Sequence, residues 1–370
     1  MKLALLIFLG LILAGCAVFS QSLGYYWQSA GGHLSVLRQA KPIDDWINDA
    51  QTKPALKSKL EIAREIRAFA SRELGLPDNG SYKSFADLKR PSVVYNVLAT
   101  PELSLQMRQW CFPIVGCVTY RGYYNKDAAD AFAADLRAQG DDVHVSGAPA
   151  YSTLGYFDDP LLNTFINYPD AELARLVFHE LSHQVVYIKN DTTFNESFAT
   201  AVETLGVERW LAAQNNPKLA KDYQEFVGRR ADFLALLQRY RARLEQTYAA
   251  AGAISQATDQ AKVRQQKSQV FVDLKAEYES IKAQRWNGYA GYDRWFAQPL
   301  TNAHLAAVAT YTDLVPGFIK MARNLSASEN VTADASAVNF PQFFAAVKSL
   351  SLQDKAQRDS QLNSATEFVK

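Results

Sequence analysis

The chain has 370 residues, of which 48% are hydrophobic, so it can bury a substantial core in one large domain or two. Its 39 Lys and Arg residues nearly balance 38 Asp and Glu residues, which leaves a formal net charge of +1. Proteins that bind nucleic acid neutralise its phosphates with an excess of Lys and Arg. The balanced charge of this chain gives no sign of such an excess, so we do not expect a nucleic-acid partner. Three cysteines are too few for a cage of sulfur ligands around a metal.

Residues 1–15 have the features of an export signal. Lys2 precedes an apolar run over residues 3–14, which is too short to cross a bilayer. The run ends in Leu-Ala-Gly-Cys, which resembles the lipobox of bacterial lipoproteins and would make Cys16 the acylated first residue of the mature chain. By resemblance to lipoprotein sorting, Ala17 favours anchoring on the periplasmic side of the outer membrane. The alternative is an ordinary cleaved signal with an incidental cysteine.

The next part of the chain mixes helical and strand-like patterns. Helices are expected over residues 34–50 and 54–74, and Gly75 and Pro77 close the second. Further on, the patterns predict strands over residues 93–98, 118–124 and 143–145, with a helix over residues 128–138.

Two cysteines lie close together among these strands. Cys111 and Cys117 enclose Pro113 and Gly116, which can turn the chain back on itself. In an oxidising compartment we expect a local disulfide bond between them. The alternative is a pair of buried free thiols, because sequence alone does not show how closely two Cβ atoms approach.

The strongest chemical signal is His-Glu-Leu-Ser-His at residues 179–183. Four residues advance a helix by about one turn, so His179 and His183 share one face and can direct two ring nitrogens at one metal ion. Glu180 points to the side, where it can take a proton from water beside that ion. Apolar neighbours predict that this helix, capped by Asp170, is largely buried, which favours a zinc site over two surface histidines.

A catalytic zinc site usually has three protein ligands, and a second helix beginning near Asn195 offers the third. Glu196 lies in its first turn, where a carboxylate can face two imidazoles on an antiparallel helix. With this residue the chain resembles the gluzincin metallopeptidases, and the aminopeptidase N family in particular, whose motif is His-Glu-x-x-His followed by Asn-Glu-x-x-Ala. The matching residues are His179, Glu180, His183, Asn195, Glu196 and Ala199.

This resemblance implies that Glu196 is the third ligand and that Glu203 and Asn195 support the ligands from behind. One departure keeps an alternative open. Only the 12 residues 184–195 separate His183 from Glu196, whereas eighteen are usual in aminopeptidase N relatives. Glu203 is therefore the rival third ligand.

The mature chain as a whole resembles a family of bacterial lipoproteins described as putative aminopeptidases. The resemblance is carried by uncommon strings at residues 24–28, 110–113, 117–123, 150–155 and 194–199.

By resemblance to gluzincins, the extended or looped residues 147–157 lie where a substrate backbone is held. The alternative is a plain loop. Candidate substrate-binding residues are Gly147, Tyr151, Ser152 and Gly155. The segment lacks the Glu that holds the substrate's amino group in aminopeptidase N relatives, so aminopeptidase and endopeptidase activity both stay open. The acids that could replace it are Asp158, Asp159 and Glu172.

The second half of the chain is helical. Two apolar stripes at alternating three- and four-residue spacing, joined by residues 250–257, predict a long helical hairpin. A donor to the developing oxyanion could come from this half. The alternative for each candidate, and the one favoured for any of them taken alone, is a core residue. These candidates are Tyr289, Tyr292, His304 and Tyr311.

We therefore expect a mostly helical α+β fold, with a small sheet in a gluzincin-like catalytic part over residues 16–210 and the hairpin in residues 211–370. The expected function is a zinc-dependent peptidase of the cell envelope, most simply an aminopeptidase, with Glu180 as general base. The alternative is a non-catalytic envelope assembly or chaperone-like lipoprotein that keeps a structural zinc site. Glu180 favours the enzyme, because a purely structural site gains nothing from an acid there.

Overall fold

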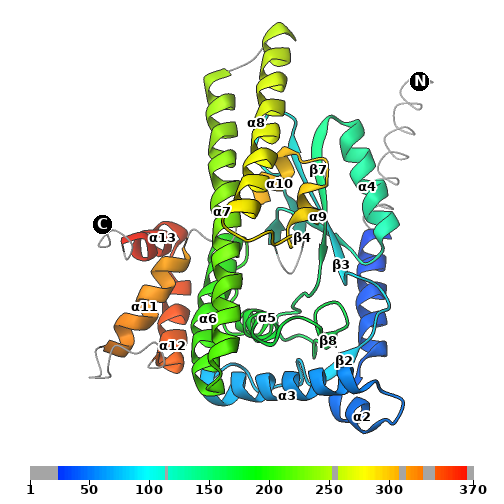
Figure 1. Ribbon diagram of the computed structural model, residues 1–370, viewed down its shortest axis with the longest axis vertical. Helices are drawn as coiled ribbons and strands as arrows, with labels where there is room; N and C mark the ends of the chain where they lie inside the picture. The colour runs from blue at the N-terminus through cyan, green and yellow to red at the C-terminus, as the bar shows by residue number, and fades with distance from the viewer. Residues whose placement is uncertain (1–23, 113–115, 252–256, 308–313, 328–337, 365–370) are drawn as a thin grey trace, which may run out of the picture.

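The computed structural model describes residues 24–112, 116–251, 257–307, 314–327 and 338–364. Cys16, predicted to carry the lipid, and the oxyanion candidate Tyr311 lie outside these residues. The described chain forms the mostly helical α+β fold that the sequence predicted, with small sheets and a long helical hairpin (Figure 1).

The first described segment differs from the single helix expected over residues 34–50. Residues 24–39 are helical, and a two-residue strand, β1 (Lys41–Pro42), interrupts the chain before helix α2 (Ile43–Asn48). Proline has no backbone N–H and disfavours a helical conformation of the residue before it, so the helix cannot continue through position 42. The following helix, α3 (Pro54–Leu74), has the predicted bounds and ends at Gly75 with a left-handed φ of 63°.

Three small sheets follow. The first has the order β1-β2-β8, with β2 (Ser84–Ala86) and β8 (Leu161–Leu162). The second has the order β6-β3-β7, with β3 (Val94–Pro101), β6 (Arg121–Tyr123) and β7 (Asp141–Ala148), and α4 (Lys126–Ala138) packs on it. The third is the antiparallel pair β4 (Trp110–Phe112) and β5 (Gly116–Val118).

The strand expected over residues 118–124 is divided between β5 and β6. A bend at Thr119 lets the two parts pair with different partners, β5 with β4 and β6 with β3. Cys111 and Cys117 lie opposite each other on β4 and β5, with their sulfur atoms joined. That this bond forms in the cell stays a prediction.

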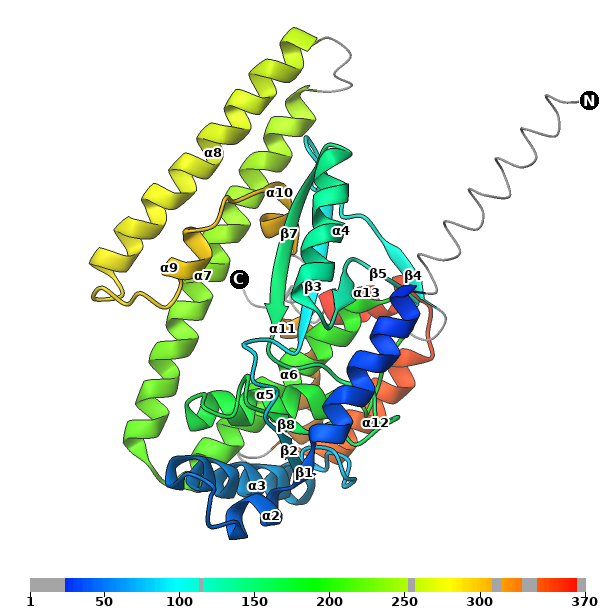
Figure 2. The same cartoon turned by 90° about the vertical axis from the view of Figure 1, so that its right-hand side faces the viewer.

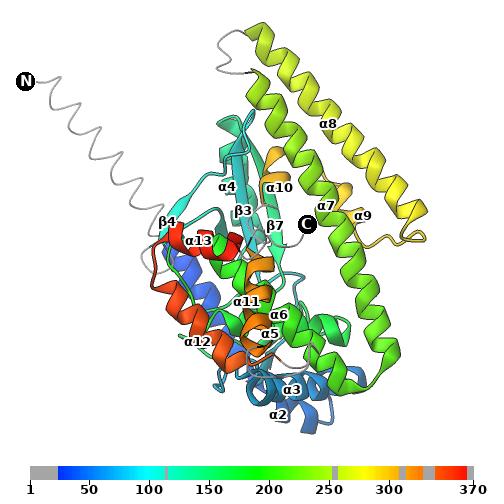
Figure 3. The same cartoon turned by 90° about the vertical axis from the view of Figure 1, so that its left-hand side faces the viewer.

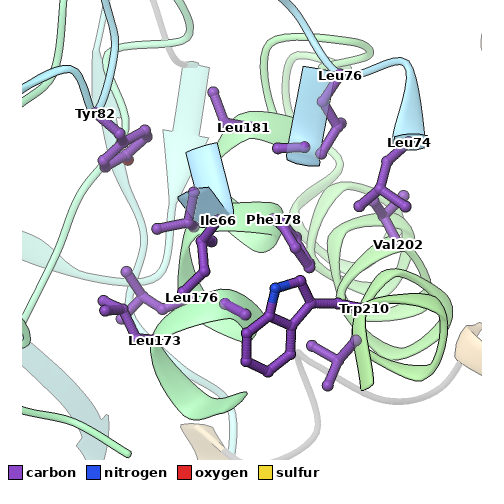
Figure 4. Packing of buried hydrophobic residues seen from close by; sticks show 14 of the residues in the cluster. Ile66, Leu74, Leu76, Tyr82, Leu173, Leu176, Phe178, Leu181, Val202 and Trp210 are labelled. Atoms are coloured by element: carbon purple, nitrogen blue, oxygen red, sulfur yellow. The ribbon is translucent and has the colours of Figure 1, made fainter. Parts of the chain in front are cut away.

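The core is centred on the contact between α5 (Asp170–Ser182) and α6 (Thr192–Gln214) (Figure 4). Phe178 of α5 is fully buried near Phe69 of α3, with ring centroids 6.2 Å apart. A Cβ atom on Gly206 of α6 would lie 3.0 Å from the Phe178 ring, so this glycine allows the close approach of the two helices. Asp170, expected as the cap of α5, is its first residue, and Pro169 precedes it.

Three C-terminal helices pack against α6, as Figure 3 shows. Phe198 of α6 lies 5.7 Å from Phe318 and 5.9 Å from Phe343, measured between ring centroids. Residues from both sides of position 210 therefore share the largest hydrophobic cluster. The helices are α11 (Val315–Ala327), α12 (Phe340–Ser351) and α13 (Lys355–Ser364).

The helical hairpin consists of α7 (Pro217–Ala251) and α8 (Ala257–Gln284), which run side by side away from the α5–α6 core (Figure 2). The hairpin has its own hydrophobic cluster, which includes Leu274 and Tyr278. Two short helices, α9 (Asp293–Phe296) and α10 (Asn302–Ala306), connect it to β7. Among the helices that the structure describes, none combines the length and hydropathy needed to span a membrane.

A pair of buried histidines joins the hairpin region to the second sheet. His144 of β7 and His304 of α10 lie with ring centroids 3.8 Å apart, and the edge of Trp295 contacts His304. Burial, with a smaller contribution from Arg137, lowers the pKa of His144 to about 4. Burial, with smaller contributions from His144 and Arg137, lowers the pKa of His304 to about 2. Both rings are therefore neutral at pH 7.

We expect this pair to make the protein less stable in mild acid. A histidine in the unfolded chain has a pKa near 6.5, so below that pH the unfolded state binds more protons than the folded state. The stabilisation is complete above pH ~6.5 and is lost as the pH falls towards the folded pKa of His144, about 4. At about 1.4 kcal/mol per pKa unit, the loss is on the order of 3 kcal/mol.

Urea unfolding at several pH values between about 7 and about 4 measures this loss. His144→Phe keeps an aromatic ring beside His304 but removes one titrating group, so its free energy of unfolding should depend less on pH in this range. Equal pH dependence in the wild type and the variant would contradict the assignment.

Candidate functional site

The two motif histidines converge with Glu196 between α5 and α6. His179 lies in the last turn of α5, and His183 is the residue at its C-terminal cap. The Nε2 atom of His179 lies 3.3 Å from Glu196 Oε2, and the Nε2 atom of His183 lies 3.9 Å from Glu196 Oε1. All three ligand atoms lie within 4.8 Å of one another, and within the described ranges no other His, Cys, Asp or Glu cluster meets this condition. Two nitrogens and one carboxylate oxygen are a ligand set that suits zinc.

The short connection between the two helices is closed by Asn195. Its side chain accepts a hydrogen bond from the backbone N–H of Ile188 and donates one to the Ile188 carbonyl, both at 2.8 Å. Asn190 in the same loop accepts a hydrogen bond from the backbone N–H of Cys117 at 2.8 Å. Gly116 beside it has a φ of 80°, and a Cβ atom there would collide with the Asn190 side chain. These contacts show how a loop shorter than usual still brings Glu196 opposite the histidines.

Glu203 lies behind His179. Its Oε2 atom is 2.9 Å from the Nδ1 atom of His179 and also accepts a hydrogen bond from Arg175 at 2.9 Å. Nδ1 is the ring nitrogen that does not face Glu196, so Glu203 orients the imidazole. Arg230 of α7 adds a second cation, 3.8 Å from Glu203 Oε1. Glu203 is buried, which alone would raise its pKa, but Arg175, His179 and Arg230 together lower it to about 2.

The electrostatics of the site favour a bound cation. Burial would lower the pKa of His179, but hydrogen bonds to Glu196 and Glu203 raise it to about 10. The two carboxylates therefore stabilise a positive charge at His179. A divalent ion bound there would supply this charge in place of the proton. Burial lowers the pKa of His183 to about 4, so its ring is neutral and keeps a lone pair for a metal.

Glu180 lies beside the ligands and lines the same pocket as His183 and Glu196. Burial raises its pKa to about 7, with His179 acting in the opposite direction and Glu196 in the same one. A carboxyl group with this pKa can both accept and return a proton near neutral pH.

The pocket has a volume of about 480 Å³. Besides the site residues, two tyrosines that the sequence did not single out, Tyr120 and Tyr187, line it. Tyr120 lies at the bend after β5, and burial together with Glu196 raises the pKa of its hydroxyl, which stays protonated at neutral pH. Burial and Glu196 likewise raise the pKa of Tyr187. Tyr187 follows His183 by four residues, a spacing that could have drawn attention to it.

The predicted substrate segment meets this pocket in part. Tyr151 and Ser152 line it. Gly147 lies within β7, where it is the partner of Tyr95. Gly155, with a φ of 81°, lies against the side chain of Gln184.

The three acids proposed to hold a substrate amine lie in different places. The carboxylate of Asp158 lies against Gly80. Asp159 acts electrostatically on Glu180, and its Oδ2 accepts hydrogen bonds from the backbone N–H and the hydroxyl of Thr153, at 2.8 and 3.0 Å. Its other oxygen, Oδ1, is buried without a hydrogen-bond partner. Glu172 precedes Glu180 by eight residues on α5, which corresponds to about 12 Å along the helix.

The oxyanion candidates that the structure describes lie in the hairpin region. Tyr292 stacks on Phe233 with ring centroids 4.1 Å apart, and Tyr289 lies under the guanidinium of Arg229. His304 stacks on His144 as described above. The structure thus brings Tyr120 and Tyr187, and not these residues, into the pocket with Glu180.

A larger cavity, of about 600 Å³, lies beside α2 and α3, but its charged groups are already paired. Arg64 contacts Asp44 at 2.7 Å, and Lys83 contacts Asp78 at 2.7 Å. Arg67 donates hydrogen bonds to the Ser81 and Pro77 carbonyls, both at 2.7 Å. We therefore place the chemistry in the smaller pocket, where the metal-ligand group lies.

A protein-family model described as "Putative aminopeptidase" matches residues 24–362, which is most of the chain. Comparison of this chain with curated proteins and with solved structures found no significant match.

The geometry predicts different roles for the two glutamates of α6. Glu196→Ala removes a ligand atom and should weaken zinc binding most strongly. Glu203→Gln removes only the carboxylate behind His179 and should weaken it about 10- to 100-fold. Competition with a chromophoric chelator measures both affinities. If Glu203→Gln empties the site while Glu196→Ala still binds zinc, the ligand assignment is wrong.

Proposed function

Because the chain belongs to the family described as "Putative aminopeptidase", we propose that it is a zinc-dependent peptidase. The observation that carries this proposal is the meeting of His179, His183 and Glu196 beside Glu180 in one pocket. Zinc would be held by the two Nε2 atoms and the Glu196 carboxylate. When bound, zinc would polarise the substrate carbonyl and make a neighbouring water more acidic.

Glu180 is the general base in this proposal. It lines the pocket next to His183 and Glu196, where it can take a proton from the attacking water. Its raised pKa of about 7 then allows the same carboxyl group to pass the proton to the leaving amine. Among the described residues that line the pocket, the only other acid is Glu196, which is assigned as a metal ligand.

The hydroxyls of Tyr120 and Tyr187 can donate hydrogen bonds to the negative charge that develops on the substrate oxygen. Both line the pocket with Glu180, and their raised pKa values keep them protonated.

The substrate backbone would lie along residues 148–152. Ala148, Ala150, Tyr151 and Ser152 line the pocket, and the segment leaves the sheet at Ala148, the last residue of β7. An extended peptide could pair with this segment as an additional strand.

The competing function is an envelope assembly or chaperone-like protein with a structural zinc site. Structural zinc sites are closed by four protein ligands. Three ligands next to a pocket that contains an acid and two tyrosines favour catalysis instead. Action in the cell envelope, anchored to the outer membrane through Cys16, is part of our proposal and rests on the sequence of residues 1–17 alone.

Substitution of Glu180 separates metal binding from chemistry. Glu180→Gln keeps the size of the side chain but cannot accept the proton, so we expect normal zinc content and a loss of peptide hydrolysis of at least 100-fold. Glu172→Gln is the matched control, because it lies on the same helix outside the pocket. Metal analysis and a peptide-library cleavage assay provide the two measurements. Full activity of Glu180→Gln would refute the proposed mechanism.

The position of cleavage can be tested with paired substrates. No Lys or Arg is among the described residues that line the pocket, whereas Glu180 and Glu196 are, so a free amino group is favoured over a free carboxylate. We expect a peptide with a free N-terminus to be cleaved at least tenfold faster than its acetylated form. Equal cleavage of both would identify an endopeptidase and leave the zinc mechanism intact.

A further inference from the structure

One wall of the pocket is aromatic. Tyr25 and Tyr26, from the helix of residues 24–39, and Phe112 of β4 line it. Tyr120 connects this wall to the metal-ligand group, because it interacts electrostatically with Glu196 and Glu180 and also with Tyr25. The aromatic wall therefore lies within the same pocket as the metal-ligand group.

The rings of the wall are held in place by their neighbours. Tyr25 stacks on Phe112 with centroids 5.5 Å apart, and the guanidinium of Arg121 lies 4.1 Å from the centre of the Tyr25 ring. Tyr26 meets Phe112 edge to face at 6.5 Å and remains 44% exposed, while Phe112 is half-buried. Tyr26 and Phe112 thus offer apolar surface that the folded chain does not cover fully.

The charges around the pocket exclude one class of occupant. The only charged side chains among its described lining residues are the acids Glu180 and Glu196, apart from the titratable His183. An acidic side chain would meet like charge there. The neighbouring cation, Arg121, does not line the pocket, and its guanidinium lies against the rings of Tyr25 and Phe132, 4.1 and 4.6 Å from their centres. A large apolar side chain would instead bury its surface against the rings, where aromatic pairs add to the burial.

We infer that Tyr26 and Phe112 form a specificity subsite that accepts an aromatic or large aliphatic side chain next to the scissile bond. This inference rests on the proposed peptidase function, since it assigns the substrate class of the same site. The subsite selects peptides whose cleaved residue is Phe, Tyr or Leu over those with Ala or Asp.

A series of X-Ala-Ala peptides, with Phe, Leu, Ala, Asp or Arg at X, tests this inference on the zinc-loaded protein. We expect kcat/KM for Phe and Leu to exceed that for Ala at least tenfold, and Asp to be the poorest substrate. Tyr26→Ala and Phe112→Ala should each reduce the preference for Phe over Ala, whereas Tyr26→Phe should retain it. Trp27→Ala is the matched control, because Trp27 is 83% exposed and does not line the pocket.

A binding experiment separates the failure of this inference from the failure of the proposed function. Calorimetry with Glu180→Gln protein should show tighter binding of Phe-Ala-Ala than of Ala-Ala-Ala, and Tyr26→Ala in that background should remove the difference. If peptides are cleaved without preference for Phe, or if Arg is preferred, the subsite assignment is wrong and the peptidase proposal stands. If no tripeptide is cleaved but the binding preference depends on Tyr26, the aminopeptidase form of the proposed function fails and the subsite stands.

Discussion

The contact between α5 and α6 places ionisable groups in the apolar core, and the rest of the site depends on how they pair. Helix α5 and its cap present Arg175, His179 and His183 at steps of four residues, and α6 presents Glu196 and Glu203 seven residues apart. The two rows alternate, so that Glu203 lies between Arg175 and His179, and Glu196 faces both histidines. Buried charges are tolerated only when they are paired, and removing one partner typically costs about 3–5 kcal/mol. The register of the two helices is therefore fixed by charge as well as by packing around Gly206.

Groups far from the pocket hold the start of α6, which carries Glu196. Asp191 caps the helix by accepting a hydrogen bond from the backbone N–H of Phe194 at 3.3 Å. The same carboxylate accepts a hydrogen bond at 2.6 Å from Arg358 of α13, and both residues are buried. A segment more than 150 residues later in the chain thus fixes the first turn of the helix. This contact joins the C-terminal helices to the helix that carries Glu196, and both share one hydrophobic core with α5.

Periodic features of the sequence were predictable, and features that depend on distant pairing were not. The bounds of α3 and the shared face of His179 and His183 follow from patterns within one helix. The hairpin follows from two such patterns in succession. Tyr120 lies at a bend between two short strands of different sheets, so no local pattern could place it in the pocket. Tyr292 was a reasonable candidate by residue type, but stacking on Phe233 makes it part of the hairpin core. An aromatic residue has the same identity in a core and in a site, and only the tertiary structure separates the two.

The hairpin is also connected to the site by charge. Arg230 of α7 lies 3.8 Å from Glu203 and faces the carboxylate oxygen that Arg175 does not bind. Glu203 in turn contacts Nδ1 of His179. Arg175 of α5 and Arg230 of α7 therefore position the His179 ring indirectly, by holding the carboxylate that contacts it. Because Glu203 is buried, their attraction is weakly screened, and both keep it anionic. An anionic Glu203 accepts a hydrogen bond from Nδ1–H of His179. When a metal ion takes the place of the Nε2 proton, this bond would keep the proton on Nδ1 and leave Nε2 as the lone-pair donor.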